Sequence, residues 1–195
     1  YGFIKNATAF LIGAVRNNVY MAEDYGYAMQ LAVLAATELG VATCWLGGTF
    51  TRSAFAQKIS QQADEMIPAV VAAGLAEANS REKDGLRKRI QADRRLPWEE
   101  LFFNEHWLQP LQRAASAEYA LALDMLRLAP SASNKQPWRV VRDGDRWHFY
   151  CQRTPGYGRG GPVFSVLKLA DLQRLDVGIA MCHFEQTLLA QGVQG

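Results

Sequence analysis

Cysteine, net charge and long apolar runs are all scarce in this sequence. Its three cysteines, Cys44, Cys151 and Cys182, are odd in number and show no Cys-x-x-Cys spacing, so neither a disulfide framework nor a zinc site is expected. The net charge of +2 over 195 residues is too small to favour a nucleic acid as the main partner. No apolar stretch approaches the roughly 18 residues that a membrane-spanning helix needs. The histidines show no metal-ligand spacing, and we expect no metal.

The N-terminus carries no charged-then-apolar leader, so secretion is unsupported and a cytoplasmic location is expected. Hydrophobic residues make up 49% of the chain and charged residues 21%, which is typical of a soluble globular protein. The length fits one ordinary domain or two small ones. The chain opens on Tyr1 and closes in "LLAQGVQG", so we expect both ends to be cut.

An internal repeat organises the chain. The stretch "DYGYAMQLAVLAATELGV", which begins at Asp24, aligns without gaps with "DVGIAMCHFEQTLLAQGV", which begins at Asp176. The two aspartates predict helix N-caps, and Gly40 and Gly192 predict left-handed residues that end the helices. The first copy is apolar almost all round, which predicts a fully buried helix. Two unrelated alanine-rich helices are the alternative.

Hydrophobic periodicity and turn residues predict the remaining elements. These are buried strands at residues 7–15 and 68–75, a short helix at 51–60, a helix at 117–128 that Pro130 terminates, and a β-hairpin at 138–151 that turns at Asp143-Gly144. Strands and helices that do not alternate strictly favour an α+β fold. With the repeat, they divide the chain into a first half at 1–78, a basic connector at 79–115 and a second half at 116–195.

A dense set of hydrogen-bonding groups lies in "APSASNKQPWR" (residues 129–139), between the helix and the hairpin. Pro130 stiffens the start of this loop. The hydroxyls of Ser131 and Ser133 and the amide of Asn134 can each donate and accept hydrogen bonds. Such a loop suits a ligand edge that carries both donors and acceptors. A capped turn without a ligand is the alternative.

This loop resembles the A-P-S-x-x-N-x-Q-P-W segment that lies over the flavin in FMN-dependent nitroreductases. A second segment, "ELGVATCWLGG" (38–48), is similar to the family's buried helix that ends in a Gly-containing turn beside the flavin. "PAVVAAGL" (68–75) resembles the strand that follows, and "ADRRLPWEELF" (92–102) resembles a later basic segment. The resemblance covers most of the chain. It implies a nitroreductase-like α+β fold with a central, mostly antiparallel sheet flanked by helices.

The order of the two segments is unusual for that family. In ordinary members the P-S-x-x-N loop precedes the Gly turn, and the active unit is an intertwined homodimer. With the repeat, the reversed order implies a duplicated single chain of the Thermotoga type, whose two related halves mimic the homodimer. We therefore expect a monomer that acts as a pseudo-dimer, or a weak homodimer. The family's Arg-rich N-terminal motif would lie before Tyr1, so a missing N-terminal segment on the order of 50 residues is expected.

The resemblance also implies a flavin site where the halves meet. Backbone N–H groups of the loop would stabilise negative charge on a reduced flavin, and paired glycines let a backbone approach a planar ring. A guanidinium fork fits phosphate oxygens, and the family's Arg-x-Pro pattern singles out Arg95 for that role. A plain helix C-cap at the glycines and a solvated connector around Arg95 are the alternatives. The implied FMN-binding residues are Pro130, Ser131, Ala132, Ser133, Asn134, Leu46, Gly47, Gly48 and Arg95.

The implied function is that of an FMN-dependent oxidoreductase. It would take hydride from NAD(P)H at the flavin N5 and pass it to a small acceptor such as a nitroaromatic or a quinone. No side chain is expected to act as acid, base or nucleophile, because the flavin brings its own hydride chemistry. A flavin-binding sensor or carrier without turnover is the competing class, and a structural protein with an empty pocket is a third.

A thiol enzyme is a further alternative, since Cys44-Trp45 and His183 lie near the spacing of papain-type Cys–His enzymes. The residues before Cys44 do not match that motif. Cys44 is also expected just after a helix C-terminus, where the dipole would raise the pKa of a thiol. In the repeat His183 aligns with Leu31, an apolar position, so a core or cleft-edge histidine is the favoured interpretation.

Overall fold

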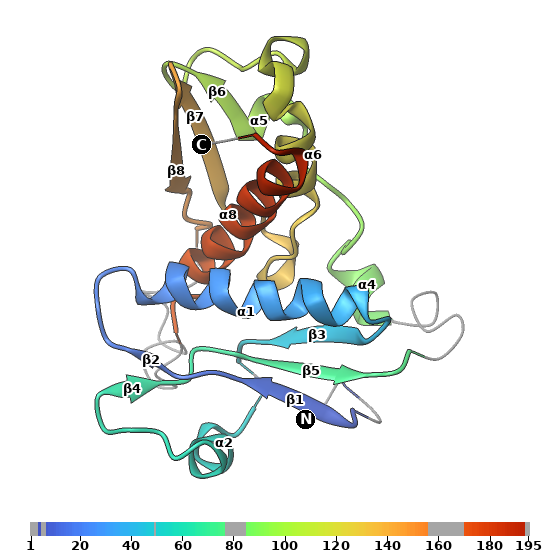
Figure 1. Ribbon diagram of the computed structural model, residues 1–195, viewed down its shortest axis with the longest axis vertical. Helices are drawn as coiled ribbons and strands as arrows, with labels where there is room; N and C mark the ends of the chain where they lie inside the picture. Colours follow the sequence, from blue (N-terminus) through green and yellow to red (C-terminus); the bar gives the residue numbers. More distant parts are fainter. Residues whose placement is uncertain (1–3, 5–6, 49, 77–84, 156–169, 194–195) are drawn as a thin grey trace.

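The computed structural model describes residues 4, 7–48, 50–76, 85–155 and 170–193 of the chain. The described elements fall into two lobes, which meet where helix α1 (Met21–Glu38) passes helix α8 (Leu172–Gln191), as Figure 1 shows. Each lobe combines one of these two helices with a small sheet. The fold is therefore α+β, as the sequence predicts.

The first lobe is a three-stranded antiparallel sheet with a helix on each face. Its strands are β1 (Ala9–Ile12), β5 (Val70–Gly74) and β3 (Ala42–Leu46), in the order β1-β5-β3, with a short ladder of β2 (Val15–Arg16) and β4 (Glu65–Met66) beside them. Successive residues of a strand face opposite sides. Val71 accordingly packs in the core under α1, while Val70 packs on the other face with Phe55 of α2 (Arg52–Lys58).

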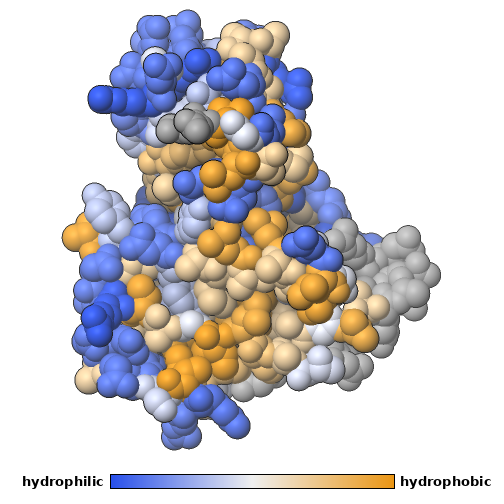
Figure 2. All heavy atoms as spheres, viewed as in Figure 1, coloured by the Kyte–Doolittle hydropathy of each residue, from blue (hydrophilic) through white to orange (hydrophobic). Residues whose placement is uncertain are grey.

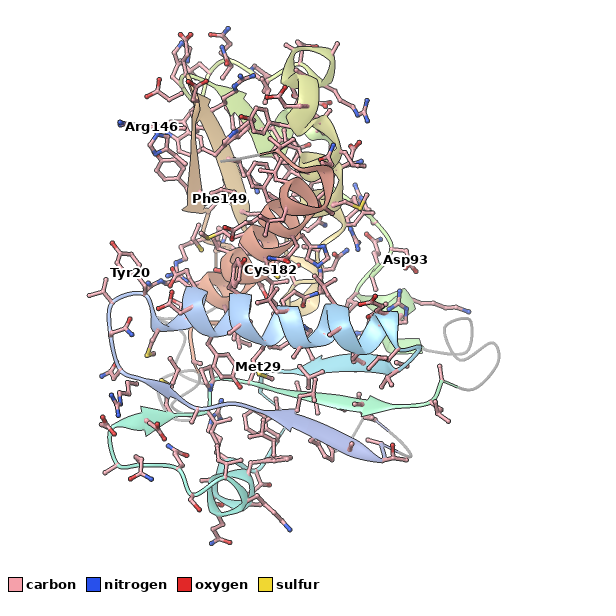
Figure 3. All side chains as sticks on the ribbon, in the orientation of Figure 1. Tyr20, Met29, Asp93, Arg146, Phe149 and Cys182 are labelled. Carbon is pink, nitrogen blue, oxygen red and sulfur yellow. The ribbon has the colours of Figure 1, made fainter. Side chains whose placement is uncertain are left out.

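The second lobe holds a mixed sheet in the order β6-β7-β8, in which β6 runs parallel to β7 and β7 antiparallel to β8. Its strands are β6 (Phe102–Asn104), β7 (Trp138–Asp143) and β8 (Arg146–Cys151). Its other elements are α4 (Gly85–Arg89), α5 (Trp98–Leu101), the 3-10 turn η1 (Arg113–Tyr119), α6 (Ala120–Leu128) and the 3-10 turn η2 (Ala132–Asn134). Phe149 of β8 points toward α8 in Figure 3, where its ring packs edge-on against Phe184 at 5.6 Å between centroids.

Most of the elements predicted from hydrophobic patterning are present. The apolar stretch 68–75 forms β5, the helix expected at 51–60 is α2, and the helix before Pro130 is α6. The hairpin turns at Gly144-Asp145, one residue later than predicted, and Gly144 takes a φ of +60° there. The strands are mostly antiparallel as expected, but in the described residues they are shared between the sheets of the two lobes and not joined in one central sheet. The division at residues 78 and 115 stays a prediction.

Strand β3 is the main element that the sequence did not predict. Its residues were expected to form a Gly-containing turn directly after α1. Instead they pair along the whole length of β5, with Trp45 opposite Val71. A short apolar run after a helix carries too little periodicity to be assigned as a strand, and it is the pairing with β5 that makes it one.

The predicted helix starts are wrong, whereas the predicted helix ends are confirmed. α1 begins at Met21, so Asp24 lies within its first turn. The N-cap of α8 is Asp171, and Asp176 lies one turn inside the helix. Both helices begin before their repeated segment, so the aspartates cannot cap them. Gly40 and Gly192 both follow the helices with left-handed φ angles of +74° and +71°, as the repeat predicts.

The two repeated glycines lie where α1 and α8 cross. A Cβ atom on Gly26 would lie 2.1 Å from the carbonyl oxygen of Leu175, and one on Gly178 would lie 2.0 Å from that of Glu23. Neither distance is possible for real atoms, so the two backbones are closer than any side chain permits. Residues 23 and 175 differ by the same 152 positions as the two glycines, so the two contacts exchange under the repeat.

Ionic and polar contacts surround this crossing. The Arg174 guanidinium binds the Glu23 carboxylate through two bonds of 2.5 and 2.6 Å. About one turn after Glu23 on α1, Tyr27 donates a hydrogen bond of 2.5 Å to Glu185. Together with the apolar residues between them, these bonds join the two lobes into one core.

That core is continuous from one lobe to the other. It includes Met29 and Val71 of the first lobe and Leu126, Trp138 and Ile179 of the second, all at most 8% exposed. In Figure 3, Met29 extends from α1 toward the sheet beneath it.

The outer side of α1 is less buried than the sequence predicts. Leu31 is 38% exposed, and alanines of the same helix also reach the surface. Figure 2 shows this apolar face along α1 and over the sheet below. α1 is therefore buried toward its sheet and toward α8, but not all round.

We predict that Gly178→Ala lowers the free energy of unfolding by about 3 kcal/mol, near the upper end of the cost of overpacking. The added methyl group would meet the Glu23 carbonyl and force the helices apart. Denaturant unfolding monitored by circular dichroism measures the change.

The matched control is Gly85→Ala, because a Cβ atom there meets nothing within 4 Å and the residue has no positive φ. We expect that control to unfold at nearly the same denaturant concentration as the wild type. Equal stability of the two variants would show that the helices do not cross this closely.

Candidate functional site

The loop after α6 has a compact, strained backbone. Ser133, Asn134 and Gln136 have φ angles of +51°, +53° and +48°, which non-glycine residues adopt only where the surroundings enforce it. Part of that support comes from Ser131. Its side-chain oxygen accepts a 2.9 Å hydrogen bond from the Gln136 N–H, and its carbonyl accepts another of 2.9 Å from the Asn134 N–H.

The connector packs against this loop and supplies further hydrogen-bond partners. The Asn134 side-chain amide donates to the carbonyl oxygens of Gln91 and Arg94 at 2.6 and 2.9 Å. The Leu96 N–H donates to the Gln136 side-chain oxygen at 2.9 Å. The side-chain NH₂ group of Asn134 is thus occupied within the protein. The side-chain oxygen of Asn134 is the part of the amide left for a ligand. The Ser133 side chain is exposed.

Asp176 anchors the loop to α8. Both oxygens of its carboxyl group lie 3.1 Å from the Ala132 N–H, which donates to them. The residue is only 2% exposed. Burial raises the pKa of Asp176 well above its usual value, and the Ala132 N–H opposes that rise. The loop is therefore hydrogen-bonded to α8 through Asp176, a residue that the sequence predicted to be a helix cap.

The second predicted segment, Leu46–Gly48, lies at the start of the same helix. Leu46 is buried at the end of β3, and Gly48 is exposed. A Cβ atom on Gly47 would lie 2.6 Å from the side chain of Leu172, so Gly47 lies directly against the end of that side chain. Because Leu172 and Asp176 are four residues apart, they share one face of α8. The structure thus brings both predicted segments to the first two turns of α8.

Arg95, which is predicted to bind the FMN phosphate, is held by backbone carbonyl oxygens. Its guanidinium donates to the carbonyl oxygens of Ala92 at 2.7 Å, Arg94 at 3.0 Å and Leu128 at 3.0 Å. Burial lowers the pKa of Arg95. Its Nε atom is buried and has no hydrogen-bond partner among the described residues. Arg95 therefore ties the connector to the end of α6, and a phosphate would compete with carbonyl oxygens for it.

The thiol-enzyme alternative has no geometric support. Cys44 is exposed on β3, whereas the His183 ring binds Gln30 and the backbone of Met125. Burial lowers the pKa of His183 to about 4, so the ring is a poor base at neutral pH. Across the described parts of the chain, no three Cys, His, Asp or Glu side chains are grouped as metal ligands would be.

A surface cleft lies elsewhere on the molecule. It has a volume of about 700 Å³ and opens on the outer face of the β6-β7-β8 sheet, where Phe103, Trp107, Arg139 and Tyr150 line it. A smaller one of about 390 Å³ lies near the N-terminal ends of α1 and α8 and is lined partly by Asp171. Neither cleft is lined by the residues predicted to bind FMN.

The family described as "Putative TM nitroreductase" matches residues 1–188 of the chain. The chain belongs to this family. An oxidoreductase function is the general expectation for a nitroreductase, and the resemblance noted in the sequence is confirmed at the level of the family.

The nitroreductase fold is also shared with a solved structure. The chain resembles the crystal structure of a protein from Thermotoga maritima described as a "putative nitroreductase", with a TM-score of 0.55 and 19% sequence identity. The match covers 97% of this chain and 69% of the other. No curated protein sequence matches the chain. None of the described helices is long and apolar enough to cross a membrane.

We predict that Asp176→Ala destabilises the protein by about 1–3 kcal/mol, since the partly buried Ala132 N–H would lose its acceptor. Asp176→Asn keeps an oxygen for that N–H and is the matched control. Its effect should depend on pH. The raised pKa of Asp176 means that wild-type stability falls as pH rises above 3.8, the usual aspartate value, and the amide removes this dependence.

Urea unfolding of both variants at pH 4 and pH 7 tests these effects. Relative to the wild type, Asp176→Asn should be more stable at pH 7 than it is at pH 4. If Asp176→Ala and Asp176→Asn lost the same free energy of unfolding at both pH values, the anchoring role would be contradicted.

Proposed function

We propose that the chain is an FMN-dependent oxidoreductase that uses NAD(P)H and passes reducing equivalents to a small acceptor such as a nitroaromatic or a quinone. Membership of the nitroreductase family supports the reaction class. The observation that carries the proposal is the convergence of Leu46–Gly48 and Pro130–Asn134 on one face of α8, at Leu172 and Asp176.

The chemistry of the exposed groups at this place fits a flavin. The hydroxyl of Ser133 can donate and accept, and the carbonyl oxygen of Asn134 can accept, which suits an edge with mixed donors and acceptors. Gly47 is packed against Leu172, but Gly48 is exposed and has no side chain, so a flat ring can lie against the backbone there. Ser131 and Ala132, whose polar groups bind Gln136 and Asp176, would hold the loop in shape.

Arg95 and Pro130 would take part less directly. The buried Nε of Arg95 has no partner in the described residues, so the side chain has one donor to offer beyond the carbonyl oxygens that it already binds. Phosphate could recruit this donor or replace one of those carbonyls. Pro130 would stiffen the entry to the loop.

FMN, when bound, supplies the hydride chemistry, and the chain supplies binding and orientation. We assign no acid, base or nucleophile among the side chains. We also propose that one chain acts as a pseudo-dimer in the cytoplasm, or as a weak homodimer. A flavin-binding sensor or carrier would use the same residues, and turnover separates it from an enzyme.

The test is an absorption spectrum of the purified protein mixed with FMN, followed by an assay of NAD(P)H oxidation with a quinone. We predict bound FMN and many turnovers per protein. Oxidation of one equivalent of NAD(P)H would indicate a carrier or sensor. Failure to bind FMN or to quench its fluorescence would refute the proposal.

Ser133→Ala tests the site itself. We predict an FMN affinity lower by about 5–10-fold, because one hydrogen bond is lost. Ser53→Ala is the matched control, since Ser53 is exposed on α2, in a different part of the lobe. Equal affinities of the two variants would place the flavin away from this loop.

A further inference from the structure

A chain of polar side chains crosses the junction of α1 and α8. The Trp45 indole N–H donates to Oε1 of Gln30 at 3.1 Å. The Nε2 atoms of Gln30 and His183 lie 3.0 Å apart, and His183 also bonds to the backbone of Met125. This polar chain (Trp45, Gln30, His183 and the Met125 backbone) links β3, α1, α8 and α6, and therefore both lobes.

The direction of every bond in this chain follows from its first member. An indole N–H can only donate, so the carbonyl oxygen of Gln30 must face Trp45. The NH₂ group of Gln30 then faces His183, whose Nε2 must accept and so carries no proton. The other ring nitrogen bears the hydrogen and donates to the Met125 carbonyl. His183 is thereby fixed in one neutral tautomer.

The surroundings of His183 agree with a neutral ring. Burial is the main cause that lowers the pKa of His183 to about 4, and the positive charge of Arg95 lowers it further, while the bond to Met125 raises it. Gln30 itself is 2% exposed. Losing either of its bonds would leave a buried polar group unpaired, which is costly. The polar chain is thus a rigid part of the junction between α1 and α8.

We propose that Gln30 and His183 are positioning residues that orient Trp45, and with it the adjoining Leu46–Gly48 segment, at the flavin site. This inference rests on the proposed function. Trp45 is the residue immediately before that segment and lies next to Leu46 on β3.

The His183–Met125 end of the polar chain lies near the second predicted segment, Pro130–Asn134. Met125 lies three residues before Leu128, whose carbonyl accepts a bond from Arg95, and residues three apart on a helix are neighbours. α6 then leads directly into the loop at Pro130. The polar chain therefore ends on α6, the helix that precedes the second segment. Cys182, which precedes His183 and which the repeat aligns with Gln30, lies where α8 passes α1 in Figure 3.

Gln30→Glu tests the hydrogen bonds. The variant keeps an oxygen for Trp45, but it places a carboxylate against Nε2 of His183. We predict that the pKa of His183, read from its imidazole proton resonances, rises from about 4 to above its usual 6.5. His183→Gln identifies the resonance among the three histidines. A pKa that stays near 4 in Gln30→Glu would show that Gln30 and His183 are not bonded.

Gln30→Met tests the positioning role. We predict that the Trp45 indole N–H exchanges faster with solvent and that FMN affinity falls by about 10-fold. Gln57→Met is the matched control, because Gln57 is an exposed residue of helix α2. In the Gln30→Glu variant, which keeps the bond to Trp45, indole exchange should stay close to that of the wild type. If Gln30→Met matches Gln57→Met in indole exchange and FMN affinity, the positioning role is refuted.

The readouts separate this inference from the proposed function. The imidazole pKa and the indole exchange are measured without flavin, so they decide whether the polar chain exists. A wild-type protein that binds no FMN would refute the proposed function and the flavin part of this inference together. A wild type that binds FMN, with a Gln30→Met variant that binds it equally well, would refute the inference alone.

Discussion

The crossing of α1 and α8 is the constraint on which the rest of the structure depends. At Gly26 and Gly178 the backbone of each helix lies directly against a carbonyl of the other, and only glycine permits that separation. The two lobes therefore share one core and hold α8 at a fixed place against α1. Because a packed interior does not deform gradually, a change at the crossing would be felt wherever α8 makes a contact.

The candidate site is built on this helix and on the elements tied to it. The loop at Pro130–Asn134 is pinned by Asp176, and the Leu46–Gly48 segment lies against Leu172. The strained backbone of the loop is held by bonds from the connector as well. Ligand contacts are most precise when rigid elements position them, and here one helix, one strand and a bonded connector do so.

The sequence predicts the elements with strong local signals and misses those that tertiary contacts create. Pro130 and Gly192 mark helix ends, and both predictions hold. Strand β3 was missed because it exists through its pairing with β5. Asp176 was expected as a cap, yet its partner is Ala132, 44 positions away. The partners of the Asn134 side-chain amide are carbonyl oxygens at least 40 positions away. No local pattern encodes such contacts, so the loop could be found by resemblance but its supports could not.

The most direct test of a shared flavin site is an FMN titration of the ¹⁵N-labelled protein, followed by amide resonances in both segments. We predict that the amides of Gly47 and Gly48 and those of Ser133 and Asn134 shift together and saturate at one equivalent of FMN. Shifts confined to one segment, or absent from both, would contradict a single site built by the two lobes against α8.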